Sequence, residues 1–553
     1  MKESLLILIC CLPEIFFSCS IKENPELPYL KQNGEAMQLM VDGKPYLILG
    51  GELHNSSSSS RDYMRKFWPQ LEASGMNTVL AAVEWSLVEP EEGKFDFTII
   101  DNLLEDARAH NLRLILLWFG SWKNAQSPYI PDWIKSDFAR FPRVKAHFGK
   151  SLEILSPFYE ESLNADIKAF TAVMRHLSEV DSEYRTVIMM QVENEVGILG
   201  SARDHSPAAE TAFNSSVPQE LLNYLIKNKS GLLPELDETW KANDYKTTGT
   251  WEEVFGMNEK TDEIFMAWNY AIYINSIAKA GKSEYPLPMF VNAWLVQKSD
   301  KVPGDYPSGG PQAHMLDIWK AGSPDIDLYV PDIYRPEFAE ICALYTRNNN
   351  TLFIPEARAG ELGAGQFFYS IGRHKSIGYS PFGFEARTVD TENDPVTIAY
   401  KTASGMAPLI LDAQSNGTIT SVLLNTETKT SEEIVMGDYK LLAEIPSAPQ
   451  QPLPYESYGI IMNPAPDEYI IYGKNIQFSF SAATPGPAIA GIAHTDEGLF
   501  ENGKWVPGRR LNGDEIYLSI DLAAKALENK TGTGIKFYNG NDKIQWVKLY
   551  RYE

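Results

Sequence analysis

Cysteine is scarce in this sequence. The 553 residues contain four, Cys10, Cys11, Cys19 and Cys342, and three of these stand close to the N-terminus. A disulfide framework needs several cysteines that can pair, and a cysteine-based zinc site needs a cluster of them. If the leader is removed at Cys19 and that residue is lipidated, Cys342 alone remains free. We therefore expect neither kind of cross-link.

Positive charge is also in short supply. The chain has 49 Lys and Arg against 73 Asp and Glu, which gives a formal net charge of -24. A field of this sign repels nucleic-acid phosphates and anionic membrane surfaces, so we expect no nucleic-acid partner. It is compatible with a neutral ligand.

Long apolar runs are confined to the start of the chain. Lys2 precedes a run from Leu5 to Phe17, which is too short to span a bilayer as a mature helix, and no later run is long enough. The run ends in Ser-Cys19-Ser, which resembles a bacterial lipoprotein cleavage site, although Phe16 stands where such sites carry Leu or Val.

That resemblance implies a leader over residues 1–19 and lipidation of Cys19. It also implies export across the inner membrane, with the protein lipid-anchored in the outer membrane or periplasmic, and contact with a membrane only through the lipid. The alternative is an ordinary secretion signal, cut nearby, in which Cys19 is incidental. The oligomeric state is left open.

Several catalytic motifs are missing. No Gly-rich phosphate turn follows the first expected strand, and no Gly-x-Ser-x-Gly turn offers a serine nucleophile. His54, His314 and His374 stand alone, without the spacing of a zinc-binding pair. We expect no cofactor and no catalytic metal.

Apolar runs alternate with helical patterns over residues 20–395. The expected strands are Leu47–His54, Thr78–Trp85, Leu112–Phe119, Thr186–Glu195, Leu287–Trp294, Ile326–Tyr334, Thr351–Ala359 and Ile377–Glu385, with an irregular stretch over 200–260. Eight continuous runs, most of them separated by helices, predict an α/β fold of the (β/α)8 TIM-barrel type. A doubly wound open sheet is the alternative, and the missing phosphate turn argues against it.

The pattern changes over residues 396–553. Turn-rich sequence separates short segments such as Thr420–Leu424, Tyr469–Tyr472 and Ile476–Phe480. This pattern predicts a C-terminal antiparallel domain of the β-sandwich type.

Polar residues close five of the expected barrel strands. They are Glu52, His54, Glu84, Glu193, Asn194, Glu195, Tyr334 and Glu356. Because a carboxylate at the end of an apolar strand loses hydration, one such residue is commonly a structural ion pair. Convergence of five strand ends predicts an active site at the carboxyl face of the barrel.

Two of these carboxylates resemble a known catalytic pair. Glycoside hydrolysis needs one carboxyl as acid and base and another as nucleophile or base. Gln191-Val-Glu-Asn-Glu195-Val-Gly197 resembles the motif of family 35 glycoside hydrolases, the β-galactosidases, and Phe353-Ile-Pro-Glu356 falls where their nucleophile belongs. The resemblance implies Glu195 as acid/base, Glu356 as nucleophile and Asn194 as a ligand of the sugar 2-hydroxyl.

The resemblance runs from about residue 40 to 390 and also implies binding residues. Glu52 and His54 are expected to bind the substrate, and Tyr334 to donate a hydrogen bond to Glu356. Glu193 lies two positions before Glu195, so ideal strand geometry places both on one side. Its expected role is structural, or to hold an Arg that lines the barrel.

The loop after the third strand departs from the family. Relatives carry Cys-Ala-Glu-Trp, whereas this chain has Trp118-Phe-Gly-Ser-Trp122-Lys123-Asn124. We expect Trp118 and Trp122 to form an aromatic wall and Lys123 and Asn124 to replace the missing polar groups. The alternative is that this loop packs on the rim. Of all the tryptophans at strand ends, Trp294 included, one or two are expected to stack on sugars.

The expected function is an exo-acting retaining β-galactosidase that removes terminal β-D-galactose from side chains of plant polysaccharides, with xyloglucan as the first candidate. One alternative is the same mechanism on another sugar, as in a β-glucosaminidase or a family 42-like enzyme. The other is a surface glycan-binding protein without catalysis, against which the intact pair of Glu195 and Glu356 argues.

Overall fold

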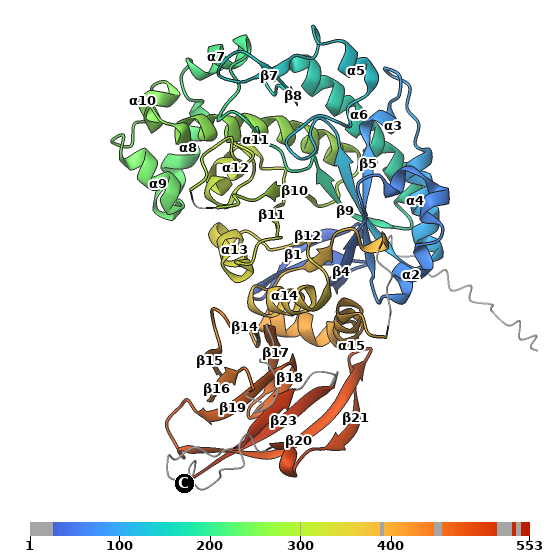
Figure 1. Ribbon diagram of the computed structural model, residues 1–553, viewed down its shortest axis with the longest axis vertical. Coiled ribbons are helices and arrows are strands. Elements are labelled where there is room, and N and C mark those ends of the chain that lie inside the picture. The colour runs from blue at the N-terminus through green and yellow to red at the C-terminus, as the bar shows by residue number, and fades with distance from the viewer. Residues whose placement is uncertain (1–25, 299, 387–391, 447–455, 517–532, 538–542) are drawn as a thin grey trace, which may run out of the picture.

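The computed structural model describes residues 26–298, 300–386, 392–446, 456–516, 533–537 and 543–553 (Figure 1). The leader predicted over residues 1–19, with Cys19, lies outside them. In the described part of the chain, no helix has the length and apolar character needed to cross a membrane.

Eight parallel strands form the barrel that fills the upper part of Figure 1. They are β4 (Ile48–Glu52), β5 (Thr78–Glu84), β6 (Arg113–Phe119), β9 (Val187–Val192), β10 (Met289–Trp294), β11 (Leu328–Asp332), β12 (Ile354–Ala357) and β13 (Gly378–Pro381). The backbone N–H of Ile333 donates to the carbonyl of Glu356 over 2.9 Å, which joins β11 to β12 and closes the ring. The predicted TIM barrel is confirmed, and every expected strand is present.

Alternation along the strands divides the apolar side chains between two cores. Leu117 and Phe119 belong to the cluster inside the barrel, whereas Leu116 and Trp118 belong to the cluster beneath the helices. The outer helices are α1 (Arg61–Met64), α2 (Trp68–Ala73), α4 (Thr98–Ala109), α6 (Glu160–Asp181), α11 (Glu259–Glu284), α12 (Leu316–Gly322), α13 (Phe338–Tyr345), α14 (Gly360–Arg373) and α15 (Pro395–Asn416).

Smaller elements complete the barrel. An N-terminal sheet of β1 (Tyr29–Asn33), β2 (Ala36–Val41) and β3 (Lys44–Tyr46) contributes Leu39 and Val41 to the interior cluster. Short helices α3 (Trp85–Val88) and α5 (Asp132–Ser136) and the hairpin of β7 (Arg143–Lys145) and β8 (Ser151–Leu155) lie in the loops after β5 and β6.

The stretch expected to be irregular, residues 200–260, holds four short helices. They are α7 (Pro207–Phe213), α8 (Gln219–Asn228), α9 (Pro234–Lys241) and α10 (Trp251–Phe255). Proline in the first turn starts α7 and α9, and a capping box of Thr250 and Glu253 starts α10. These helices are too short for apolar periodicity to reveal, so the expectation of irregular structure is wrong here.

The C-terminal domain is an antiparallel sandwich, as predicted. One sheet has the order β14-β17-β18-β23-β20-β21 and the other β15-β16-β19-β22. The strands are β14 (Ile419–Asn425), β15 (Ser431–Met436), β16 (Tyr439–Glu444), β17 (Glu456–Ala465), β18 (Glu468–Lys474), β19 (Ile476–Ala482), β20 (Ile489–Glu501), β21 (Lys504–Arg510), β22 (Gly534–Phe537) and β23 (Ile544–Tyr552). Their facing apolar side chains form a separate core.

Helices α14 and α15 lie between the barrel and the sandwich (Figure 1). Phe368 of α14 packs against Tyr458 and Tyr472, with ring centroids 5.9 and 5.0 Å apart. Tyr400 of α15 places its hydroxyl 2.8 Å from the carbonyl oxygen of Gly50, inside the barrel wall. The predicted division at residues 395/396 thus falls at the start of a helix that follows the eighth strand and packs on the barrel.

Candidate active site

A pocket of about 440 Å³ opens at the carboxyl ends of the strands. It is lined by Asn124, Glu195, Trp294, Gln297, Asp332, Tyr334, Arg335 and Glu356. These residues come from the ends of, or the loops after, β6, β9, β10, β11 and β12. The structure therefore brings together Glu195, Glu356, Tyr334 and Asn124, four of the residues singled out in the sequence.

Glu195 sits on a sharp turn after β9. The strand ends at Val192, and Glu193 and Glu195 have φ values of 63° and 45°. Positive φ is uncommon for residues with a side chain and is tolerated where neighbours hold the backbone. Here the backbone N–H of Glu195 donates to Oδ1 of Asn292 over 2.9 Å, and its carbonyl accepts from Ala125 over 3.0 Å.

The environment of Glu195 favours its protonated form. Burial, followed by the nearby charge of Glu356, raises the pKa of Glu195 to about 7, against the opposing influence of Lys123 and a hydrogen bond with Asp332. Only 8% of Glu195 is exposed. A carboxyl with this pKa can donate a proton near neutral pH and take it back later, which is what an acid/base catalyst requires.

Glu356 lies near the end of β12, and one of its two carboxylate oxygens has no hydrogen-bond partner among the described residues. Its Oε1 accepts a hydrogen bond of 2.6 Å from the hydroxyl of Tyr334. Its Oε2 is buried and has no hydrogen-bond partner in the described part of the protein. Burial, and then Glu356, raises the pKa of Tyr334 well above its ordinary value, so the phenol remains a donor. This arrangement leaves one oriented carboxylate oxygen for chemistry.

Glu193 does not share the side of Glu195, contrary to strand geometry. Its carboxyl accepts from the backbone N–H groups of Ser121, at 3.1 Å, and Trp122, at 2.6 Å. Burial, together with Asp166, raises the pKa of Glu193 well above its ordinary range. The turn with positive φ ends the alternation, and Glu193 fixes the loop after β6 instead of lining the pocket.

Two further residues present unpaired polar atoms near Glu195 and Glu356. Both amide atoms of Asn194 are buried without a hydrogen-bond partner among the described residues, and so is Oε1 of Glu52. Burial, then the charge of Glu356, raises the pKa of Glu52 well above its ordinary range. Buried polar groups are normally paired, so these atoms are suited to the hydroxyl groups of a ligand.

His54 and Lys123 lie beside this group. The Nδ1 atom of His54 is 3.0 Å from Oε1 of the fully buried Glu385, which holds the imidazole at the end of the first strand. The ammonium of Lys123 is 4.9 Å from the ring centre of Phe119. Its positive charge offsets part of the rise that burial and Glu356 cause in the pKa of Glu52 and Glu195. Neither residue lines the 440 Å³ pocket.

The expected aromatic wall of Trp118 and Trp122 is wrong. Trp118 points outward from β6, is fully buried and donates through Nε1 to Asp166 over 2.9 Å. Trp122 is also fully buried and donates to the carbonyl of Leu155 over 3.0 Å. Strand alternation directs Trp118 toward the helices, and the loop packs as the alternative foresaw. Trp294 is the tryptophan that lines the pocket.

Asn292 and Asp332 are not among the residues singled out in the sequence. Nδ2 of Asn292 donates to Oδ2 of Asp332 over 2.7 Å, while its Oδ1 accepts from the backbone of Glu195. Burial, with the charges of Glu356 and Glu195, raises the pKa of Asp332 well above its ordinary range. A polar side chain inside each of two apolar strands was the signal that could have found them. In the described residues, no cluster of His, Cys, Asp and Glu is arranged to hold a metal ion.

Comparison with known proteins agrees with this geometry. Residues 38–265 match the model of the family described as glycosyl hydrolases family 35. The match covers the first four strands of the barrel, with Glu195, and ends within α11. Residues 396–521 match a domain of unknown function, DUF5597, which covers α15 and most of the sandwich.

Several proteins similar to this part of the chain carry β-galactosidase names. A beta-galactosidase of Xanthomonas manihotis is 29% identical over 183 residues, which are 32% of this chain and 28% of that protein. The human beta-galactosidase-1-like protein 3 is 30% identical over 182 residues, 31% of this chain and 25% of that protein. The chain thus matches only about a quarter of the length of these curated relatives.

Solved structures with some similarity to the chain include a beta-galactosidase and a beta-amylase. The beta-galactosidase of Bacillus circulans sp. alkalophilus has a TM-score of 0.44 and 14% identity, over 66% of this chain and 57% of that one. The catalytic domain of a beta-amylase from Paenibacillus polymyxa has a TM-score of 0.42 and 12% identity, over 60% and 91%.

Proposed function

We propose that this protein is an exo-acting retaining β-galactosidase. The observation that carries the proposal is the pair at the ends of the fourth and seventh strands. Glu195, with a pKa raised to about 7, and Glu356, oriented by Tyr334, line one pocket. The family 35 match and the names of the relatives support β-galactose as the sugar.

In the first step, Oε2 of Glu356 attacks the anomeric carbon of the terminal galactose. The bond from that carbon to the glycosidic oxygen breaks, and the proton of Glu195 passes to the departing oxygen. In the second step, Glu195 takes a proton from water, whose oxygen attacks the same carbon and releases Glu356. The configuration at that carbon is retained because it is inverted twice.

The groups around the pair account for recognition of the sugar. Neither Asn194 nor Glu52 lines the 440 Å³ pocket, but both carry buried polar atoms without a partner in the described residues. We assign these atoms to sugar hydroxyls, and the 2-hydroxyl to Asn194 as the family resemblance implies. Trp294 lines the pocket and offers an apolar face for the ring. With a volume of about 440 Å³, the pocket is large enough to hold a terminal galactose.

The proposed natural substrate is a β-galactosylated side chain of a plant polysaccharide such as xyloglucan. Trp118 and Trp122 give it no support, since both are buried. Hydrolysis rates on galactosylated xyloglucan oligosaccharides and on lactose test this substrate assignment. Faster turnover of lactose would contradict it.

The catalytic proposal is tested with a 2-fluoro-galactoside that carries a good leaving group. This reagent should form a stable adduct, and mass spectrometry should place it on Glu356. Glu356→Gln should form no adduct, whereas Glu340→Gln, which changes an exposed residue of α13, should react like the unmodified protein. An adduct on another residue overturns the assignment, and activity without any adduct indicates inversion.

Lipid anchoring through Cys19 is part of the proposal. The leader sequence supports it, and bacterial lipoproteins carry several acyl chains, which stable anchoring requires. Cys19→Ala should release the protein from membranes while leaving its activity unchanged. A wholly soluble unmodified protein in the periplasm or medium would contradict the anchor.

A further inference from the structure

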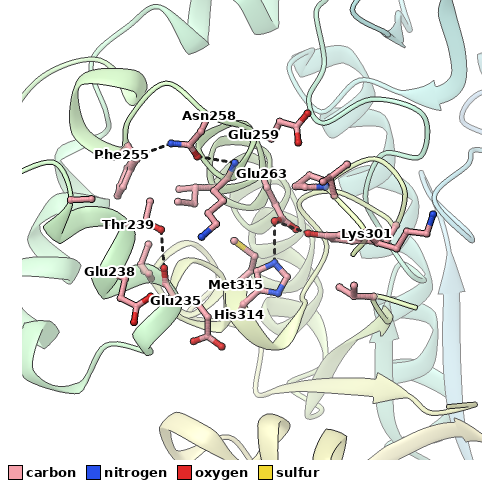
Figure 2. A pocket seen from close by; sticks show the side chains of 18 of the residues that line it. Glu235, Glu238, Thr239, Phe255, Asn258, Glu259, Glu263, Lys301, His314 and Met315 are labelled. Atoms are coloured by element: carbon pink, nitrogen blue, oxygen red, sulfur yellow. Dashed lines mark hydrogen bonds and ion pairs between the residues drawn. The ribbon is translucent and has the colours of Figure 1, made fainter. Parts of the chain in front are cut away.

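A second, larger pocket lies beside the catalytic one. Its volume is about 940 Å³, and helices α9 and α10, the start of α11 and the loop after β10 form its walls (Figure 2). Helices α9 and α10 belong to the loop after β9, so both pockets are built from loops at the carboxyl face of the barrel.

A buried carboxylate with one free oxygen lines this pocket. Glu263 is only 2% exposed, and its Oε2 accepts hydrogen bonds of 3.0 Å from the hydroxyl of Tyr306 and from Nε2 of His314. Its Oε1 has no hydrogen-bond partner anywhere in the described residues. Figure 2 shows Glu263 and His314 pointing toward one another. A carboxylate oxygen is costly to bury alone, so it is prepared for a donor from a ligand.

The remaining walls alternate apolar and polar groups. Apolar faces come from Leu236, Phe255, Ile264, Val296, Val302, Pro303 and Met315. The carboxylate of Glu235 pairs with Arg347 at 2.9 Å, and Lys301 pairs with Asp305 at 3.5 Å. The other charged lining residues are Glu238, Glu259 and Lys260. A lining of this kind offers hydroxyl acceptors beside apolar surface, with no surplus of positive charge to attract an anion. It therefore suits a neutral sugar.

The loop after β10 lies between the two pockets. Gln297 lines the catalytic pocket and its neighbour Val296 lines the larger one. Adjacent Cα atoms are about 3.8 Å apart, so one loop wall separates the two spaces. Arg335, which also lines the catalytic pocket, donates through Nη1 to the carbonyl of Val296 and fixes this wall.

We propose that the larger pocket is a leaving-group subsite, which binds a neutral sugar residue of the chain from which the terminal galactose is cut. The subsite rests on the proposed function. With this subsite, the enzyme prefers branched oligosaccharides to small galactosides. Glu263 is the polar residue of the subsite that binds the sugar. Binding there adds to the affinity of long substrates and leaves the chemistry at Glu195 and Glu356 unchanged.

The proposed subsite can be tested by filling the larger pocket with a bulky side chain placed at its rim. Ala242 is an exposed residue that lines the pocket at the end of α9, so Ala242→Trp places an indole there without disturbing a core. The matched control is Ala343→Trp, which changes an exposed alanine of α13 outside both pockets. The readout is kcat/KM for a galactosylated xyloglucan oligosaccharide and for 4-nitrophenyl β-galactoside.

Ala242→Trp should lower kcat/KM for the oligosaccharide at least tenfold and leave that for the aryl galactoside within twofold. Glu263→Gln should act in the same direction, and Ala343→Trp should change neither value. Equal effects on both substrates, or none, would overturn the subsite. If the unmodified protein cleaves no β-galactoside, the proposed function fails. Calorimetric binding of the oligosaccharide to unmodified and Ala242→Trp protein then still decides whether the pocket binds sugar.

Discussion

The hydroxyl of Tyr334 donates a hydrogen bond of 2.6 Å to Oε1 of Glu356, across the boundary between the sixth and seventh strands. This contact leaves Oε2 of Glu356 as the free oxygen and fixes its direction. A positioned nucleophile avoids part of the entropy cost of reaching the attack geometry. In the proposed reaction, this contact gives a role to the tyrosine two residues after the end of β11.

Replacement of Tyr334 by Phe should slow the first step. A hydrogen bond to a charged group contributes about 1.5–3 kcal/mol, which corresponds to a loss of roughly 10–100-fold. The measurement is the rate of adduct formation with the 2-fluoro-galactoside, alongside the Tm. Phe keeps the ring, so the Tm should hardly move. An unchanged rate of adduct formation would assign Tyr334 to packing alone.

Glu195→Ala should separate substrates by leaving group. An alkoxide leaves poorly without a proton, whereas a nitrophenolate leaves unaided. The variant should thus lose about 10²–10⁴-fold on lactose and much less on 2,4-dinitrophenyl β-galactoside. Added azide should restore turnover of the activated substrate by replacing water in the second step. Equal losses on both substrates would give Glu195 another role.

The pH dependence follows from the raised pKa of Glu195. The acid must be protonated in the first step, and its pKa of about 7 lies above its ordinary value. Activity is therefore present below this pH and lost as the pH rises through it. A profile of kcat/KM for lactose should fall about tenfold per pH unit above roughly pH 7. Glu195→Ala should lack this limb, and a limb that survives in the variant belongs to another group.

Trp122→Ala and Trp294→Ala should have opposite signatures. Trp122 is fully buried, with its ring edge-on to Tyr273 at 4.6 Å, so its removal should cost about 3–5 kcal/mol of stability. Trp294 lines the catalytic pocket, so its removal should raise KM with little change in Tm. Thermal unfolding and kinetics on lactose check both. If Trp122→Ala instead raised KM and left stability unchanged, Trp122 would contact the substrate, as the sequence predicted.

The sequence by itself determined the barrel, the sandwich and the positions of the two glutamates proposed as the catalytic pair. Continuous apolar runs separated by helical patterns permit few folds, and polar residues at the ends of such runs must meet at one face. The alternation of side chains along β6 would also have predicted that Trp118 points outward, toward the helices. The shortness of α7 to α10 kept these helices from appearing in the periodicity.

Only the tertiary structure decided what the side chains at the strand ends do. The positive φ of Glu193 and Glu195 turns one carboxyl toward the loop after β6 and leaves the other in the pocket. The hydrogen bond that Asn292 accepts from the backbone of Glu195 and the unpaired oxygen of Glu263 depend on residues far apart in the chain. Local pattern fixes the direction of a side chain only while a strand or helix continues. Beyond its end, the backbone follows the neighbours that it meets.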